Sequence, residues 1–353
     1  MLNLPLKKDI ETKEILKKSI QANRALAKLN GIAKTIPNQM ILINALALQE
    51  AKDSSEIENI ITTHDELYLA AISEQFTKEA KEVQNYKEAL LYGFKEVKKK
   101  KIITLKNIIE IQSIITGNSA GIRKQLGTVL KNEKTGEVIY TPPQNYEEIV
   151  NFLNNLFAYI NDDSLEDYDY LVKMALIHYQ FESIHPFYDG NGRTGRILNV
   201  LYLVLKDLLD LPILYLSGYI VKHKNRYYHL FNEVREKNNL KEWIIFMLDA
   251  IEDTANKSSA VIENIEKIMN NSSEAIQEKL PKIYSKDLIE TLFLHPYTKI
   301  DFLADKLKLH RQTASKYLKE LVKIGILKEL KLGRNRYYVN TELFNYLKKA
   351  VNE

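Results

Sequence analysis

The chain has 353 residues, of which 45% are apolar and 27% charged, and a net charge of +4. This length is enough for two or three domains with a sizeable core. It contains no cysteine, which excludes disulfides and thiolate metal sites, and its mild charge does not by itself indicate a partner. Glycine and proline are sparse (12 and 8), and Leu, Ile, Lys and Glu recur at helical spacing, so the sequence predicts a mainly α-helical protein.

Two apolar regions could be mistaken for targeting or membrane segments. Residues 1–16 lack the long apolar run of a signal peptide. The most apolar stretch, residues 198–216, is interrupted by charged residues and a proline (Lys206, Asp207, Asp210 and Pro212). It therefore predicts a core helix and not a membrane span, and we expect a cytoplasmic protein that does not bind a membrane.

The N-terminal part, residues 1–100, is predicted to form a helical domain. One helix is expected to end at Gly31, because glycine readily adopts the left-handed conformation that closes a helix. One or two further helices follow over residues 37–60. Asp53 and Ser54 suit the start of one of them, because their side chains can accept from free amides at a helix N-terminus.

Residues 101–255 are predicted to form a second, catalytic domain that is helical except at residues 127–143. There the β-prone runs TVL and EVIYT flank Lys134-Thr135-Gly136, which predicts a β-hairpin with glycine in its turn. Residues 170–184 and 196–205 are expected to be helices on either side of a polar motif. The second is apolar on nearly all sides, so it should lie at the centre of the domain.

The last part of the chain has a different pattern. Residues 256–282 are predicted to be a linker, with a short helix within 270–282. Within 283–353, a short helix near Leu307 and a second helix capped by Gly325 precede two β-prone runs that turn at residues 333–335. The second helix has an apolar face made by Ala314, Tyr317, Leu318 and Leu321. This order predicts a winged helix-turn-helix.

Basic residues on the second helix and on the wing predict a surface that could contact the phosphates of DNA. They are Arg311, Lys316, Lys319, Lys323, Lys328, Lys331, Arg334 and Arg336. Gln312, Thr313 and Ser315 could reach base edges. The alternative is a dimerisation or protein-docking module with a solvated lysine-rich face.

The stretch HPFYDGNGRTGR, residues 185–196, concentrates groups that suit phosphate chemistry. Glycines before a buried helix let several backbone amides point together, and the helix dipole adds positive potential. Arg193 and Arg196 follow on nearly the same face, and arginine matches phosphate oxygens with two hydrogen bonds. These residues predict a site for several phosphates in a row, as in a nucleoside triphosphate.

Two further side chains of this stretch suit a metal and a proton transfer. The Asp189 carboxylate is a hard ligand beside the phosphates, an arrangement common for Mg²⁺. The ordinary pKa of His185 suits removal of a proton from an attacking hydroxyl near neutral pH. Any one of these residues alone is more often a turn, a cap or a structural histidine, but their combination in this order is specific.

HPFYDGNGRTGR resembles the signature of the Fic family, HPFx(D/E)GNGRxxR, at every specified position. Members transfer AMP from ATP to a hydroxyl side chain of a protein, and some reverse that reaction. The resemblance implies that His185 is the general base, that Asp189 holds magnesium, and that the target hydroxyl attacks the α-phosphorus while pyrophosphate leaves. It places the other nucleotide-binding positions at Gly190, Asn191, Gly192, Arg193, Thr194, Gly195 and Arg196.

The resemblance also gives a role to two segments outside the signature. The hairpin of residues 127–143 resembles the family's flap, whose strand aligns the target segment by backbone pairing; Ile139 on this flap is included among the nucleotide-site residues. Residues 217–236 resemble the segment that lines the adenine pocket, where Tyr228, more than its neighbour Tyr227, is expected to contact the nucleoside. The alternatives are a structural hairpin and core tyrosines.

Ser54, Glu58 and Asn59 fit (S/T)xxxE(G/N), the inhibitory motif of the family, in the class II position before the catalytic domain. The resemblance implies that Glu58 pairs with Arg196 and occupies the arginine meant for the γ-phosphate. ATP could then bind only with its phosphates misplaced for in-line attack. The alternative is an ordinary surface glutamate in a helix.

Together these observations predict a protein adenylyltransferase that uses ATP and Mg²⁺ to modify a Ser, Thr or Tyr hydroxyl of a target protein or of itself, and that Glu58 inhibits. A homodimer is implied by the resemblance alone. One alternative is a hydrolase that removes AMP, with Glu58 orienting a water. Another is an ATP-sensing, DNA-binding regulator, although a pure sensor has no need of the general base His185.

Overall fold

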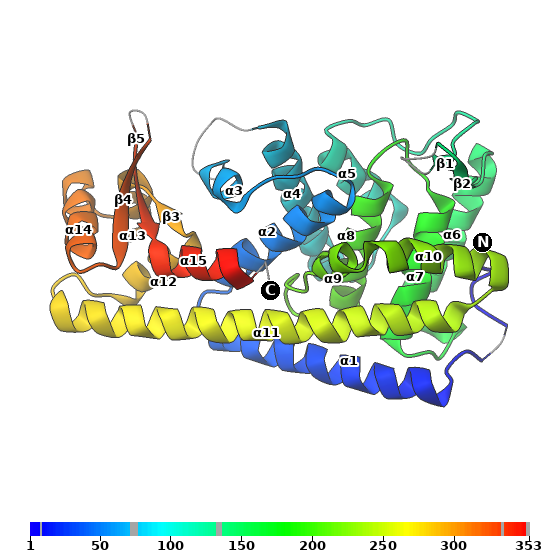
Figure 1. Ribbon diagram of the computed structural model, residues 1–353, viewed down its shortest axis with the longest axis horizontal. Coiled ribbons are helices and arrows are strands. Elements are labelled where there is room, and N and C mark those ends of the chain that lie inside the picture. Colours follow the sequence, from blue (N-terminus) through cyan, green and yellow to red (C-terminus); the bar gives the residue numbers. More distant parts are fainter. Residues whose placement is uncertain (8, 71–76, 132–135, 333–334, 351–353) are drawn as a thin grey trace.

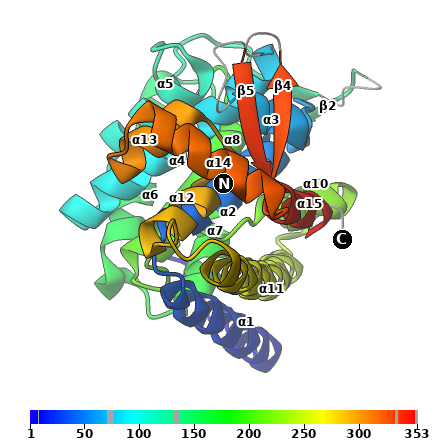
Figure 2. The ribbon, with the colours of Figure 1, turned by 90° about the vertical axis from the view of Figure 1, so that its left-hand side faces the viewer.

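The computed structural model describes residues 1–7, 9–70, 77–131, 136–332 and 335–350 (Figure 1). It is mainly helical and elongated, with the C-terminal helices and strands gathered at one end. The long helix α11 (Leu240–Lys279) runs along one side of the molecule, and α1 (Lys13–Ile32) lies against it. Seen along α11 in Figure 2, the remaining helices stack on one side of this pair.

The elements follow in chain order. The N-terminal part contains α1, α2 (Met40–Ile57), α3 (His64–Ala70) and α4 (Lys78–Lys100). The central part contains α5 (Leu105–Thr116), β1 (Leu130–Lys131), β2 (Val138–Tyr140), α6 (Tyr146–Asn161), α7 (Tyr170–Ile184), α8 (Asn191–Leu205), α9 (Ser217–Lys222) and α10 (Lys224–Lys237). After α11 come α12 (Lys286–Leu294), β3 (Tyr297–Thr298), α13 (Ile300–Leu307), α14 (Arg311–Lys323), β4 (Leu327–Leu332), β5 (Asn335–Asn340) and α15 (Thr341–Ala350).

Helix α8 lies at the centre of the fold, as its apolar sequence predicts. It packs against α2, α4, α5 and α7, and nearly all of its side chains are buried. The predicted core helix over residues 198–216 is wrong beyond Leu205. Lys206 ends the helix, Asp207 takes a left-handed conformation (φ 53°), and residues 207–216 continue as a mostly buried connection without helix. The charged pair at this position turns the chain out of the helix.

Two predicted helix boundaries in the N-terminal part are also wrong. Gly31 does not end α1, which continues to Ile32 and into a short 3₁₀ turn. Asp53 and Ser54 do not start a helix but lie in the last turns of α2. Their side chains have other partners: Asp53 accepts from the Gln49 amide at 2.8 Å, and Ser54 contacts the catalytic domain. Tertiary packing here overrides the local preference of these residues for helix ends.

Two glycines in helices predict opposite effects of the same substitution on stability. A Cβ on Gly31 would meet no atom within 4 Å, whereas on Gly93, where α4 approaches α5 and α8, it would lie 2.6 Å from Leu201 Cδ1 and 2.9 Å from Ile111 Cδ1. We expect Gly31→Ala to raise the free energy of unfolding by roughly 0.5–1 kcal/mol, through helix propensity. Gly93→Ala should lower it by roughly 1–3 kcal/mol, through overpacking. Urea unfolding of both variants checks this; equal effects of the two substitutions would contradict it.

The predicted hairpin is present. Strands β1 and β2 pair antiparallel, with Leu130 opposite Tyr140, and Gly136 has φ 71°. Of its predicted turn, Lys134 and Thr135 lie outside the described residues. In the described parts of the chain, no strand other than β1 pairs with β2.

The C-terminal part has the expected order of helix, helix and β-hairpin. β4 and β5 pair antiparallel, β3 adds to β5, and Gly325 after α14 has φ 83°; residues 333–334 of the turn lie outside the described chain. The short helix expected within 270–282 is instead the end of α11, which is 40 residues long. Its buried residues, such as Ile262 and Ile265, continue the apolar face that packs on the fold. In the described parts of the chain, no helix is both long enough and apolar enough to cross a membrane.

Candidate active site

The HPFYDGNGRTGR motif begins at the end of α7 and runs through a loop into the first turns of α8. A buried arginine braces the loop. His185 ends α7 in a left-handed conformation, φ 49°. Its carbonyl accepts from Arg123 Nε at 2.8 Å, and the Pro186 carbonyl accepts from the Arg123 backbone amide at 2.9 Å. Arg123 is fully buried. These bonds hold the histidine in a conformation that a free chain would rarely adopt.

The N-terminus of α8 forms the expected anion cradle. Gly190 adopts φ 77°, and a Cβ there would lie 3.0 Å from Thr116 Cγ2, so glycine suits this turn. The Asn191 side chain bonds both the amide and the carbonyl of Phe187, each at 2.8 Å. Its amide group therefore locks the loop, and Asn191 can offer a phosphate only its backbone. The first amides of α8 have no intrahelical partners and point out of the helix end.

Asp189 lies at the mouth of this cradle, where its side chain is 70% exposed. One of its oxygens accepts from the Gly190 amide at 2.6 Å, and the other lies 3.5 Å from Arg193. Arg193 is nearly buried and pairs with Glu82 of α4 at 3.0 Å. Among the described residues no three metal-binding side chains gather in one place. A lone exposed carboxylate fits Mg²⁺ that takes its other ligands from phosphates and water.

Arg196, in the second turn of α8, is held by the end of α2. Its guanidinium is almost wholly buried and donates from Nε to Ser54 Oγ at 2.8 Å and from one terminal nitrogen to the Ser54 carbonyl at 2.9 Å. The same nitrogen pairs with Glu58 Oε1 at 2.7 Å. A Cβ on Gly192 would lie only 2.3 Å from Glu58 Oε1. The Glu58 carboxylate therefore covers the first turn of α8, where a phosphate would sit.

The charges of the site decide the protonation of its two acid–base groups. Burial would raise the pKa of Glu58, but Arg196 beside it, with Arg193 and Lys224, holds that pKa below its usual value. Glu58 is thus ionised when it contacts Arg196. Burial, and then the positive charge of Arg123, lowers the pKa of His185 to about 4. The histidine is therefore neutral at physiological pH, as a general base must be.

The remaining residues of the predicted set occupy the edges of this site. Thr194 is fully buried, and its hydroxyl has no hydrogen-bond partner among the described residues. Gly195 is in close contact with α7: a Cβ there would lie 2.3 Å from Glu182 Oε1. Asn59 follows α2 with φ 61°, and its side chain accepts from Lys224 Nζ at 3.2 Å.

The two residues predicted outside the motif are both on the surface. Ile139 lies on β2 with 48% of its area exposed, and Tyr228 lies on α10 with 46% exposed. Tyr227 is buried, and its hydroxyl bonds His178 Nε2 at 2.7 Å. Tyr228 packs edge-on against Tyr227 and exposes nearly half of its area, which a nucleoside could contact, whereas Tyr227 belongs to the core.

Sequence reasoning missed residues that position this site from distant elements. Glu82 fixes Arg193, and Lys224 of α10 donates to the Ile57 carbonyl at the end of α2, at 2.6 Å. Burial raises the pKa of Glu182 to about 7, although Arg196 acts in the opposite direction. The only sequence signal for Glu182 is its place in the helix one turn before the motif, and Glu82 and Lys224 have none.

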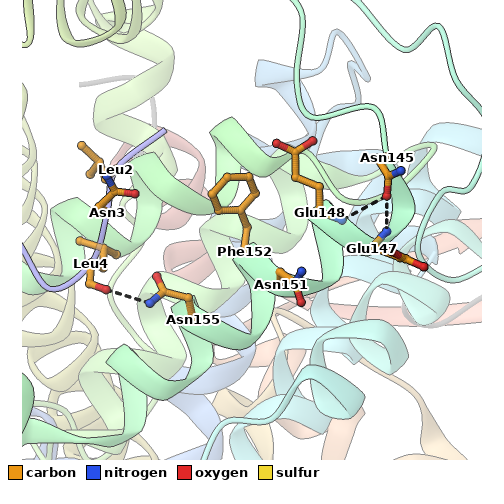
Figure 3. A pocket seen from close by; sticks show the side chains of 9 residues that line it. All are labelled: Leu2, Asn3, Leu4, Asn145, Glu147, Glu148, Asn151, Phe152 and Asn155. Carbon is orange, nitrogen blue, oxygen red and sulfur yellow. Dashed lines mark hydrogen bonds between the residues drawn. The ribbon is translucent and has the colours of Figure 1, made fainter.

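A large hollow elsewhere does not coincide with this site. It has a volume of about 570 Å³ and lies between the N-terminal segment and α6, as Figure 3 shows. Its lining residues are Leu2, Asn3, Leu4, Asn145, Glu147, Glu148, Asn151, Phe152 and Asn155. None of them belongs to the motif, and its acidic edge does not suit phosphates.

Three segments of the chain match described families. Residues 16–95 match the Fic/DOC family N-terminal domain, residues 102–203 match the Fic/DOC family, and residues 268–343 match the C-terminal domain of SoFic-like protein adenylyltransferases. A Fic family protein from Desulfovibrio desulfuricans G20 has a similar fold, with a TM-score of 0.61 and 18% identity, over 94% of this chain and 97% of that one. Fic-1 from Caenorhabditis elegans has a TM-score of 0.55 and 20% identity over 70% of this chain and 73% of that one.

Curated relatives are similar over part of the chain. The protein adenylyltransferase Fic of Drosophila yakuba is 24% identical over 192 residues, which are 53% of this chain and 36% of the relative. The protein adenylyltransferase fic-1 of Caenorhabditis elegans is 30% identical over 98 residues, 27% of this chain and 18% of the relative. The chain thus spans 36% of the length of the Drosophila yakuba relative and 18% of the length of the Caenorhabditis elegans relative. With the matches to its N-terminal, central and C-terminal segments and the mainly helical fold, the chain belongs to the Fic/DOC family.

Proposed function

We propose that this protein transfers AMP from ATP to a hydroxyl side chain of a target protein. One observation carries the proposal: His185, braced by Arg123 and with its pKa lowered to about 4, lies in the loop that leads into the α8 anion cradle, and Arg196 lies on α8. The names of the similar proteins, protein adenylyltransferases, support it. ATP is the nucleotide that this reaction requires.

The site can perform the reaction by positioning and charge stabilisation. The target hydroxyl loses its proton to His185 and attacks the α-phosphorus in line. A bond from oxygen to the α-phosphorus forms, the bond to the bridging β-oxygen breaks, and pyrophosphate leaves. The free amides of α8 and Arg196 hold the phosphates. Mg²⁺ bound at Asp189 would neutralise phosphate charge as pyrophosphate departs.

We further propose that Ser54 and Glu58 act as a brake on this site. In the structure Arg196 makes three hydrogen bonds to Ser54 of α2 and to Glu58 just after it, so three of its five N–H donors are already in use. The Glu58 carboxylate also lies against Gly192, where its negative charge repels a phosphate. ATP can reach a productive pose only after the end of α2 moves or Glu58 is removed.

The serine hydroxyl of this brake gives a graded prediction. Ser54→Ala removes the acceptor of Arg196 Nε but leaves the Ser54 carbonyl and Glu58 in place. We expect the rate of AMP transfer to rise by roughly 10–100-fold, since a hydrogen bond to a charged group contributes about 1.5–3 kcal/mol. Its neighbour Ser55 is the matched control, because its buried hydroxyl has no partner among the described residues. A rate of Ser54→Ala equal to that of Ser55→Ala would refute this role.

The experiment that tests the function uses two labelled nucleotides. The protein is incubated with Mg²⁺, with and without cell lysate, and with ATP labelled at either the α- or the γ-phosphate. Label that enters protein bands only from the α-phosphate establishes AMP transfer, whereas label from the γ-phosphate would indicate a kinase. If neither the wild type nor Glu58→Gly transfers either label to protein, the transfer function is refuted. Loss of AMP from a premodified protein would then favour the hydrolase, in which Glu58 orients a water.

Binding of DNA by the C-terminal part stays a prediction, and three of its predicted basic residues are paired with carboxylates. Arg311 pairs with Asp301 at 2.7 Å, Lys323 with Glu320 at 2.7 Å, and Arg336 with Glu329 at 2.9 Å. Each pair reduces the positive charge that the surface presents to phosphate. The homodimer likewise stays a prediction from the resemblance.

A further inference from the structure

We propose that Arg235 of α10 binds a carboxylate of the target segment, so that the site selects hydroxyl residues with an acidic neighbour two positions away. The proposal rests on the proposed function and on the free edge of β2, where the family resemblance places the target segment. It gives that site a specificity that the motif residues do not supply.

Arg235 lies against the strand on which the target would dock. Its guanidinium carbon is 3.7 Å from the ring centre of Tyr140, the last residue of β2, and 5.2 Å from that of Phe231. The Tyr140 hydroxyl donates to the carbonyl of Ser183, two residues before His185, at 2.9 Å. Figure 1 places the hairpin and the end of α10 at the same end of the molecule. Arg235 therefore lies beside the docking strand, close enough for its charge to act on His185.

No carboxylate among the described residues balances the positive charge of Arg235. One terminal nitrogen donates to Asn232 Oδ1 at 3.3 Å, the guanidinium also hydrogen-bonds the Tyr179 side chain, and its other contacts are with the rings of Tyr140 and Phe231. Among the described residues no carboxylate lies within 4.0 Å of its guanidinium, and its Nε is buried without a hydrogen-bond partner. The two arginines of α8 each have a carboxylate partner, Glu82 for Arg193 and Glu58 for Arg196, and Arg123 donates to backbone carbonyls.

The nearest acidic side chain inside the site does not supply that partner. Glu182 of α7 acts electrostatically on Arg235, but the two form no ion pair, and Glu182 Oε1 is itself buried without a partner among the described residues. Burial lowers the pKa of Arg235, which reflects the cost of a half-buried unpaired cation. A carboxylate from outside would remove that cost and form charge-assisted hydrogen bonds.

The position of Arg235 favours the target segment over ATP as the source of this carboxylate. Phosphates have their own site at the start of α8 and at Arg196, whereas Arg235 is stacked on β2. The edge of β2 away from β1 has no strand partner in the described chain, and Val138 and Ile139 are half exposed. Side chains directly opposite each other on antiparallel strands lie about 5 Å apart, so a target residue opposite Tyr140 is within reach of the guanidinium. Side chains on one strand face repeat every second residue, so the residue opposite Tyr140 shares its face with residues two positions away, and there we place the modified hydroxyl.

The test measures binding in the absence of ATP, so that it does not depend on catalysis. Three fluorescent heptapeptides share a central Thr in an extended, β-prone sequence and carry Glu, Gln or Lys at both positions two residues from it. Fluorescence anisotropy gives their affinities for the full-length protein. We expect the wild type to bind the Glu peptide about 10-fold more tightly than the Gln peptide. Arg235→Gln should remove this difference, and Arg235→Glu should shift the preference to the Lys peptide.

Two further variants separate charge recognition from a structural role. Arg226 lies on the same helix and also faces an aromatic ring, that of Phe246 at 5.8 Å, so Arg226→Gln is the matched control and should keep the Glu preference. Arg235→Lys keeps the charge and should retain most of it, which covers the case that Arg235→Gln misfolds. The proposal is overturned if the wild type binds no peptide or binds all three equally, or if Arg235→Gln keeps the preference. Failure of label transfer from ATP with an intact Glu preference would refute the proposed function and leave the carboxylate site standing.

Discussion

Glu58→Gly is expected to raise the rate of AMP transfer by roughly 100-fold or more. In the wild type, Glu58 contacts the buried Arg196 guanidinium at 2.7 Å and lies over the first turn of α8. The substitution frees the arginine for the distal phosphate and removes a negative charge from the cradle. Breaking such a pair changes the free energy of the site by about 3 kcal/mol or more, and each 1.36 kcal/mol off the barrier changes a rate about tenfold.

The control for this experiment is Glu56→Gly, two residues earlier in the chain and in the last turn of α2. Glu56 pairs with Lys52 at 2.9 Å on the surface of α2 and does not touch Arg196. Glu56 lies in the last turn of α2 and Glu58 just after it, so Glu56→Gly weakens the helix at least as much as Glu58→Gly does. The rate is measured as label incorporated from ATP labelled at the α-phosphate. A similar increase in both variants would show that a loosened helix is responsible and not the lost carboxylate.

His185→Ala, made in the Glu58→Gly protein, is expected to lower the rate of AMP transfer by about 10²–10⁴-fold, the usual contribution of a general base. The nucleotide should still bind, because the cradle of α8 and Arg196 do not depend on the imidazole. Isothermal titration of ATP gives the affinity, and label transfer gives the rate. His229→Ala is the matched control, since His229 lies on the surface of α10 and pairs only with Glu233, at 3.6 Å. A large loss of ATP affinity would contradict the role of a base.

The pH dependence of the rate of AMP transfer follows from the protonation of His185. Burial and Arg123 lower the pKa of His185 to about 4, while Glu58 acts in the opposite direction. The base is active when neutral, so its contribution is complete above this pKa and is lost as the pH falls through it. In the wild type, protonation of His185 should leave the rate unchanged between pH 6 and 8 and lower it near pH 4. In Glu58→Gly this decline should lie at a lower pH than in the wild type, because the substitution removes the negative charge that favoured the protonated imidazole.

Some features of this protein follow from short stretches of sequence. The helical spacing of apolar residues predicts the helical fold, which the structure confirms, because one buried face recurs every 3.6 residues wherever the helix lies. The glycines and arginines of residues 185–196 indicate a phosphate cradle for a related reason: its amides come from consecutive residues at the start of one helix. The structure brings Ser54 and Glu58 to Arg196, as the resemblance implied.

Other features could not be predicted from local sequence, because they depend on which elements meet. Gly31, Asp53 and Ser54 look like helix ends, but they lie within helices whose packing outweighs a preference of about 1 kcal/mol at a cap. The side chain of Asn191, expected at a phosphate, is used to lock the loop to Phe187.

The sequence by itself determined the helical class and predicts the cradle and the base, since each depends on residues close together in the chain. Only the tertiary structure decided which charges are paired. It gave Arg193 to Glu82 and Arg196 to Glu58, and it left Arg235 against Tyr140 with no acidic partner among the described residues. These contacts join residues as far as 138 positions apart. The energy of an ion pair depends on the distance between its groups and on their burial, and both are fixed only when the helices have packed.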